Sequence, residues 1–201
     1  MLLISIFLTK ELDILFFYFT QLTYVVNLIY LLSAMLYTIR PPQSREDMVW
    51  RVHRVLHIIA MAGEATVVIF YWAFVAEDTI PEYEDDCSSV TWCYINTVVT
   101  HGVSLLPSWI VVLTMYTEMY WTDFIWPTIY GLSYMFLVLL PVTLFVQNLY
   151  ADITFNNVSS YLYILGACAL LIACFFIGYY VSLRKKKGIE GALLLDQEEE
   201  Q

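Results

Sequence analysis

The chain carries very little charge for its length. Only 14% of its 201 residues are Asp, Glu, Lys or Arg, whereas 60% are hydrophobic and 17% are aromatic. A soluble domain usually carries about a quarter charged residues, so a chain this apolar would precipitate if its surface faced water. The sequence also lacks a basic patch with interleaved aromatic residues, which argues against nucleic-acid binding. The composition therefore predicts an integral membrane protein.

The N-terminal segment lacks the marks of a signal peptide. Residues 1–9 are apolar but too short to cross a membrane, and they have no basic segment before them and no small-residue cleavage site after them. We expect a short stub here, which is a re-entrant segment, an interfacial segment or the end of a missing helix.

Five stretches are long and apolar enough to cross a membrane, which takes about 20 residues. Polar breaks separate them, with Pro41-Pro42 after the first and an acidic run after the second. The predicted fold is an all-α integral membrane bundle of five transmembrane helices plus the N-terminal stub. Residues 1–183 form one transmembrane domain, and residues 184–201 form a basic and then acidic tail. The predicted spans are 13–38, 54–76, 93–116, 124–147 and 160–183.

The basic residues predict the orientation. All of them except Lys10 fall on one side of a five-span arrangement, and the positive-inside rule makes that side cytosolic. The C-terminal tail is then cytosolic, in an endomembrane or the plasma membrane. The segment from Glu190 to Leu195 fits an acidic di-leucine pattern, which would sort the protein to endosomes or lysosomes.

The opposite side carries two candidate modification sites. Asn157-Val158-Ser159 is a glycosylation sequon in a predicted lumenal loop. Cys87 and Cys93 share the other lumenal loop, where an oxidising compartment would allow a disulfide. Cys168 and Cys174 lie in the last span and are expected to be reduced packing residues.

Three predicted spans carry polar residues at helical spacing. Serine and threonine in membrane helices often only donate a hydrogen bond to a backbone carbonyl group. Asn27 is expected first to form a hydrogen bond between helices. His53 and His57 are expected to be interfacial anchors. Glu64 and His101 differ because they are ionisable and deep, which makes them functional candidates. Pro107 is expected to kink the third span. The three stripes are Thr20, Thr23 and Asn27, then His53, His57 and Glu64, then Thr97, His101, Ser104 and Ser108.

The residues around these stripes resemble the androgen-induced and androgen-dependent multi-pass membrane family. The resemblance covers roughly residues 15–180, in order and spacing, and the related rolling-stone membrane proteins share a similar frame of helices. It is carried by the runs Gln21-Leu22-Thr23-Tyr24-Val25-Val26-Asn27-Leu28, Val68 to Asp78, and Thr100-His101-Gly102-Val103-Ser104-Leu105-Leu106-Pro107.

The resemblance implies a threonine hydrolase that cleaves fatty acid esters of hydroxy fatty acids inside the membrane. It places the catalytic threonine at Thr23. The family's segment has two histidines three residues apart, of which the second is catalytic, whereas here the first is His101 and Ser104 stands at the second. Either His101 has taken over the role of base or the chemistry is lost. The family has a frame of six helices, so the missing first helix is a second departure.

Three functions follow as hypotheses. The first is hydrolysis of a lipid ester that arrives from the bilayer, with Thr23 as nucleophile, His101 as base, and Asn27, Glu64 or Ser104 in support, without a metal or cofactor. The second is a non-catalytic membrane glycoprotein of rolling-stone type with a structural, adhesion or sorting role. The third is a proton-coupled carrier that uses Glu64 and His101, although the sequence shows no clear internal repeat.

Overall fold

The structure, a computed structural model, is mostly helical in the residues that it describes, and these contain no strand. It describes residues 18–41, 44–76, 89–103, 106–115, 117–145, 150 and 153–199, with only the backbone for Val75 and residues 191–199. The predicted N-terminal stub lies outside these residues. The elements in order are α3 (Phe19–Ile39), α4 (Met48–Phe70), η1 (Tyr71–Val75), α6 (Val90–His101), α7 (Leu106–Thr114), η3 (Trp121–Phe124), α8 (Ile125–Tyr134), η4 (Met135–Leu139), α9 (Leu140–Phe145) and α10 (Val158–Glu199).

The prediction of an all-α membrane bundle with five spans is confirmed. Five helical stretches are long and apolar enough to cross a membrane, and each overlaps one of the predicted spans. The second begins earlier than predicted because Asp47 caps its first turn, accepting a 2.8 Å hydrogen bond from the Val49 backbone N–H. The observed stretches are Phe19–Ile39, Met48–Phe74, Val90–Thr114, Trp121–Phe145 and Val158–Glu190.

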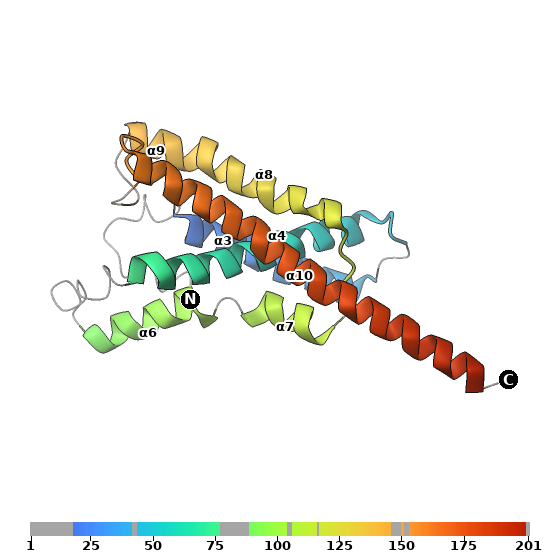
Figure 1. Ribbon diagram of the computed structural model, residues 1–201. Coiled ribbons are helices and arrows are strands. Elements are labelled where there is room, and N and C mark those ends of the chain that lie inside the picture. Colours follow the sequence, from blue (N-terminus) through green and yellow to red (C-terminus); the bar gives the residue numbers. More distant parts are fainter. Residues whose placement is uncertain are drawn as a thin grey trace.

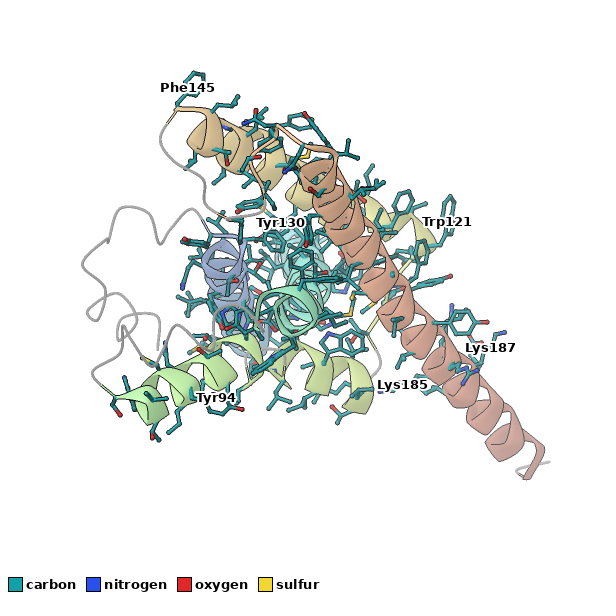
Figure 2. The ribbon with its side chains drawn as sticks, turned by 60° about the vertical axis from the view of Figure 1, so that its left-hand side comes forward. Tyr94, Trp121, Tyr130, Phe145, Lys185 and Lys187 are labelled. Atoms are coloured by element: carbon teal, nitrogen blue, oxygen red, sulfur yellow. The ribbon has the colours of Figure 1, made fainter. Side chains whose placement is uncertain are left out.

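Helix α4 is the centre of the bundle. In the most apolar stretch of its span, 61% of the residues are buried. In the other four spans the corresponding share is only 17% to 22%. Figure 2 shows α4 beside α3, with α6 and α7 on one side of the pair and α8 and α10 on the other. The apolar core packs α4 against α7 and α10 through Ile58, Met61, Val112 and Phe175. The polar residues of α4 therefore face other helices, and the outer helices turn apolar side chains to lipid.

The third span is broken in its middle. Helix α6 ends at His101 and α7 begins at Leu106, so the predicted stripe from Thr97 to Ser108 does not lie on one continuous helix. Pro107 explains the break because it has no N–H and its ring crowds the carbonyl group one turn earlier. At Gly102 a Cβ would stand 2.6 Å from the Val98 carbonyl oxygen, so only glycine fits there without a shift.

The basic end of α4 is held by a buried ion pair. Arg54 binds the Asp123 carboxylate and also donates to the Glu118 carbonyl oxygen, and its guanidinium lies 4.5 Å from the centre of the Tyr120 ring. We infer that this charged pair lies at the edge of the hydrocarbon layer, because a charged side chain is costly deeper in the membrane. The residues from Val55 to Phe74 then span about 30 Å, which matches the layer's thickness.

Helix α10 continues far beyond the last predicted span. Residues 184–199, expected as a tail, extend the same helix to Glu199. No proline interrupts this segment. Figure 1 shows α10 crossing the bundle and running out past it, with the C-terminus far from the other helices.

Candidate functional site

Glu64 is the most buried acid among the described residues. Its side chain is 1% exposed and lies on α4, the central helix. It follows Arg54 by ten residues, which is about 15 Å along the helix and places it near the middle of the hydrocarbon layer. An acid at that depth is costly unless it is paired, and it is a functional candidate for that reason.

Two other helices supply polar groups to Glu64. The Ser108 hydroxyl group on α7 donates a 2.9 Å hydrogen bond to Glu64 Oε2. The Asn27 side chain on α3 also lies within hydrogen-bonding reach of this carboxyl group. Glu64 Oε1 and Asn27 Oδ1 have no hydrogen-bond partner among the residues that the structure describes. Three helices thus meet at one carboxyl group that keeps unused bonding capacity.

The break between α6 and α7 sets the electrostatics of this contact. Ser108 is the third residue of α7, so Glu64 lies at the N-terminal end of that helix. The backbone dipoles of a helix place partial positive charge at this end, which stabilises a negatively charged group. Broken membrane helices that present their ends to a polar group at mid-membrane are typical of transporter binding sites. The predicted supporting residue Ser104 lies outside the described residues.

A row of aromatic and imidazole rings leads from Glu64 towards the basic end. The Tyr30 ring on α3 lies 5.0 Å from the His57 ring and 5.3 Å from the His53 ring, measured between centroids. Tyr30 is also near enough to Glu64 for the two groups to interact electrostatically. The expectation that His57 is an interfacial anchor is wrong, because its side chain is 1% exposed and the packing of α3 on α4 covers it.

Both ring nitrogens of His57 are unused, whereas Nδ1 of His53 has a hydrogen-bond partner. Neither ring nitrogen of His57 has a hydrogen-bond partner among the described residues. His53 Nδ1, by contrast, lies 2.9 Å from the Ser33 hydroxyl group. Glu64 follows His57 by seven residues, two turns along the same face of α4. Side chains on a helix generally lean towards its N-terminus, and from Glu64 that is the direction of His57.

Thr23 lies beside Glu64 but contacts other groups. Its side chain is 2% exposed and packs against Gly63, where a Cβ would stand 3.1 Å from Thr23 Cγ2. Thr23 Oγ1 donates to the Phe19 carbonyl oxygen at 2.8 Å and lies 3.1 Å from the Tyr130 hydroxyl oxygen. Figure 2 shows Tyr130 pointing from α8 towards the interior.

His101 lies at a different depth from Thr23. Its ring stacks on the Tyr71 ring with centroids 3.6 Å apart, and its carbonyl oxygen accepts a 2.7 Å hydrogen bond from Trp72 Nε1. Tyr71 follows Gly63, the neighbour of Thr23, by eight residues, which is about 12 Å along α4. The expected meeting of Thr23 and His101 is therefore not seen, because the His101 ring stacks on Tyr71, about two turns of α4 beyond Gly63.

The sequence pattern did not predict the tyrosines that complete this interior. Tyr134 OH donates to Tyr150 OH at 3.3 Å, and Tyr150 OH accepts a 3.1 Å hydrogen bond from the Phe19 backbone N–H. The Phe19 ring packs against both Tyr130 and Tyr134, with centroid distances of 5.4 Å and 5.0 Å. Tyrosine in a membrane protein is read first as an interfacial residue, which hides its role inside a bundle.

The structure describes the predicted glycosylation site but only one of the two cysteines of the predicted disulfide. Asn157 is exposed and caps α10, where its Oδ1 accepts a 2.9 Å hydrogen bond from the Ser160 backbone N–H. Cys87 lies outside the described residues, so its pairing with Cys93 stays a prediction. Cys168 and Cys174 are free, as predicted, and Cys174 is buried.

The cluster can hold and transfer protons, and its polar groups differ from those of a metal site. In the part of the chain that the structure describes, no three His, Cys, Asp or Glu side chains come together. Glu64 and His57 are instead accompanied by hydroxyl and amide groups. In comparisons with protein-family models, curated proteins and solved structures, no match was found. The resemblance to the androgen-induced family therefore stays a prediction.

Proposed function

We propose that the chain is a proton carrier of the membrane, in which Glu64 takes up a proton from one side and releases it to the other. One observation carries the proposal: a nearly fully buried carboxyl group at mid-membrane lies at the N-terminal end of the helix that follows a break in a span.

The physical basis is the dependence of a carboxyl group on its surroundings. A dry interior stabilises the neutral acid, whereas contact with water stabilises the anion. A small opening of the bundle around Glu64 would therefore change its proton occupancy. Ser108 and Asn27 suit both states, because a hydroxyl or amide group can donate to the anion and accept from the acid.

A purely structural role would not need an ionisable group here. Glutamine at position 64 would keep a polar group of nearly the same shape and would avoid the cost of an acid at mid-membrane. The hydrogen bond to Ser108 needs only an acceptor, which glutamine also provides. The feature that glutamine lacks is the exchangeable proton.

The test is proton flux in vesicles that contain the purified protein. A pH gradient is imposed, a potassium ionophore prevents a membrane potential, and a trapped dye reports internal pH. We expect rapid collapse of the gradient with the wild type and a rate like that of empty vesicles with Glu64→Gln. Glu118→Gln makes the same chemical change outside the hydrocarbon layer and should keep the wild-type rate. Wild-type vesicles no leakier than empty ones would overturn the proposal.

Lipid-ester hydrolysis is the second candidate. Its support is the buried hydroxyl group of Thr23, which lies next to the Tyr130 phenol at the depth of the lipid chains. The phenol could stabilise an oxyanion. A fluorophosphonate probe tests this function directly, with wild type, Thr23→Ala and His101→Ala compared. Labelling that is lost in Thr23→Ala supports hydrolysis, and equal labelling of all three argues against the predicted pair.

A further inference from the structure

The interior polar groups extend from Glu64 in both directions, and they differ in kind. Towards the basic end they are imidazole rings on α4, which can each bind a proton. Towards the acidic loop they are hydroxyl groups on α3, on α8 and at residue 150. We propose that protons reach Glu64 from the basic end through His53 and His57, and leave towards the acidic loop through Thr23, Tyr130, Tyr134 and Tyr150. This inference rests on the proposed proton carrier and names its route.

The histidine half is supported by position and burial. His53 is partly exposed near the edge of the membrane and shares a hydrogen bond with Ser33, so it can exchange protons with water. His57 lies one turn further in, on the same face of α4, fully buried and with both ring nitrogens unused. The Tyr30 ring on α3 packs against both imidazole rings, so the contacts between α3 and α4 continue from His53 to His57.

The hydroxyl half starts at the helix turn that holds Glu64. Asn27 reaches Glu64, and Thr23 lies one turn away from Asn27 on α3. Thr23 Oγ1 lies 3.1 Å from the Tyr130 hydroxyl oxygen. Tyr134 follows Tyr130 by one turn of α8 and is 3.3 Å from Tyr150, measured between hydroxyl oxygens. Tyr150 lies beyond the end of α9, on the side of the acidic loop.

Each transfer conserves protons and charge. A protonated His57 gives its proton to the Glu64 carboxylate, which leaves neutral imidazole and carboxylic acid. Glu64 then gives up its proton towards Thr23 and becomes a carboxylate again. Each hydroxyl group accepts one proton and passes its own to the next, and Tyr150 passes the last one to water on the side of the acidic loop. Both steps need only groups that donate and accept in turn, which hydroxyl groups and neutral imidazole do.

The groups around Glu64 fit this division. The side chains that lie near it on other helices are Tyr30 and Asn27 from α3 and Ser108 from α7. None of these three is a second acid or a permanent cation. The charge of Glu64 is therefore free to change without breaking an ion pair, and His57 is the next imidazole along α4 on the basic side.

The test asks from which side of the membrane Glu64 receives its proton, because each half of the route connects Glu64 to a different side. Dicyclohexylcarbodiimide modifies carboxyl groups in apolar surroundings when they are protonated, and mass spectrometry locates the adduct. In vesicles sorted by the exposure of the C-terminal helix, labelling of wild-type Glu64 should follow the pH on both sides. In His57→Phe it should follow only the acidic-loop side. In Tyr130→Phe, which removes one hydroxyl group, it should follow only the basic side.

Proton flux provides the second measurement. Both variants should slow the flux by about a hundredfold, the scale of losing one positioned proton donor. Tyr180→Phe makes the same change as Tyr130→Phe on an exposed position of α10 and should leave the flux unchanged. His57→Gln repeats the first variant with a polar side chain in case phenylalanine disturbs folding.

Failure of the route and failure of the proposed function give different results. If His57→Phe, His57→Gln and Tyr130→Phe keep wild-type flux and labelling while Glu64→Gln abolishes the flux, the route is wrong and the carrier stands. If Glu64→Gln keeps the flux, or wild type shows none, the carrier itself is wrong.

Discussion

Ser108 and Glu64 lie 44 positions apart in sequence, on different helices, and the Ser108 hydroxyl oxygen lies 2.9 Å from Glu64 Oε2. Both residues are at most 1% exposed. The contact joins the central helix to the second half of a broken span. It is therefore a support for the fold as well as a part of the proposed carrier.

Ser108→Ala should weaken both roles. It removes one partner of a buried carboxyl group, and an unsatisfied buried polar group costs about 1–3 kcal/mol in the free energy of unfolding. Thermal unfolding in detergent measures the loss. Thr114→Ala is the matched control on the same helix, because the Thr114 hydroxyl group only returns a hydrogen bond to the Ile110 carbonyl oxygen and is exposed. Equal stability of the two variants would argue that the Glu64 contact is unimportant.

The spans and the deep acid could be predicted from sequence, and the contacts between helices could not. Hydropathy locates a span because lipid contact requires about 20 apolar residues whatever the neighbours are. The depth of Glu64 follows from counting along one helix. Which group Thr23 meets depends on how α3, α4 and α8 pack, and the sequence of α3 alone does not contain that information.

The third span shows a second limit of sequence reasoning. The spacing of Thr97, His101 and Ser108 fits one helix, yet α6 ends at His101 and α7 begins at Leu106. Pro107 was expected to kink the helix, and the result depends on whether neighbours satisfy the freed carbonyl groups. Here Trp72 binds the His101 carbonyl oxygen, which allows the helix to end there.

Gly63→Val should separate α3 from α4. A Cβ at this position would stand 3.1 Å from Thr23 Cγ2 and 3.6 Å from Tyr130 Cε1, so a branched side chain has no room. Overpacking of this kind costs about 1–3 kcal/mol. The control is Gly166→Ala on α10, where nothing lies within 4 Å of an added Cβ. That change should keep or raise the unfolding temperature, because alanine favours a helix over glycine.

Breaking the Arg54–Asp123 ion pair should destabilise the basic end strongly. The two side chains are 14% and 7% exposed, and removal of one partner leaves a poorly solvated charge, which costs about 3–5 kcal/mol. We expect a large drop in unfolding temperature for Asp123→Leu and for Arg54→Met, and a smaller one for the double variant. Lys186→Ala, which breaks an exposed pair with Glu190, should change stability by less than about 1 kcal/mol. Equal effects of the buried and exposed pairs would contradict this prediction.

Two substitutions at Asn157 separate its capping role from its predicted glycan. Asn157→Asp keeps a carboxylate oxygen for the Ser160 N–H, so α10 should stay capped while the sequon is lost. Asn157→Ala loses the cap as well, at a cost of about 1 kcal/mol. Endoglycosidase treatment of protein made in eukaryotic cells should shift the wild type alone on a gel. An unshifted wild-type band would show that the sequon is not used.

The length of α10 has a consequence for whatever binds the C-terminal residues. The helix has 42 residues and is about 63 Å long, roughly twice the thickness of the hydrocarbon layer. From Leu183 to Glu199 it extends about 25 Å, which exceeds the screening length of about 8 Å in physiological salt. The acidic end is thus carried on a stiff spacer beyond the electrostatic reach of the lipid headgroups, so a partner could dock there without touching the membrane.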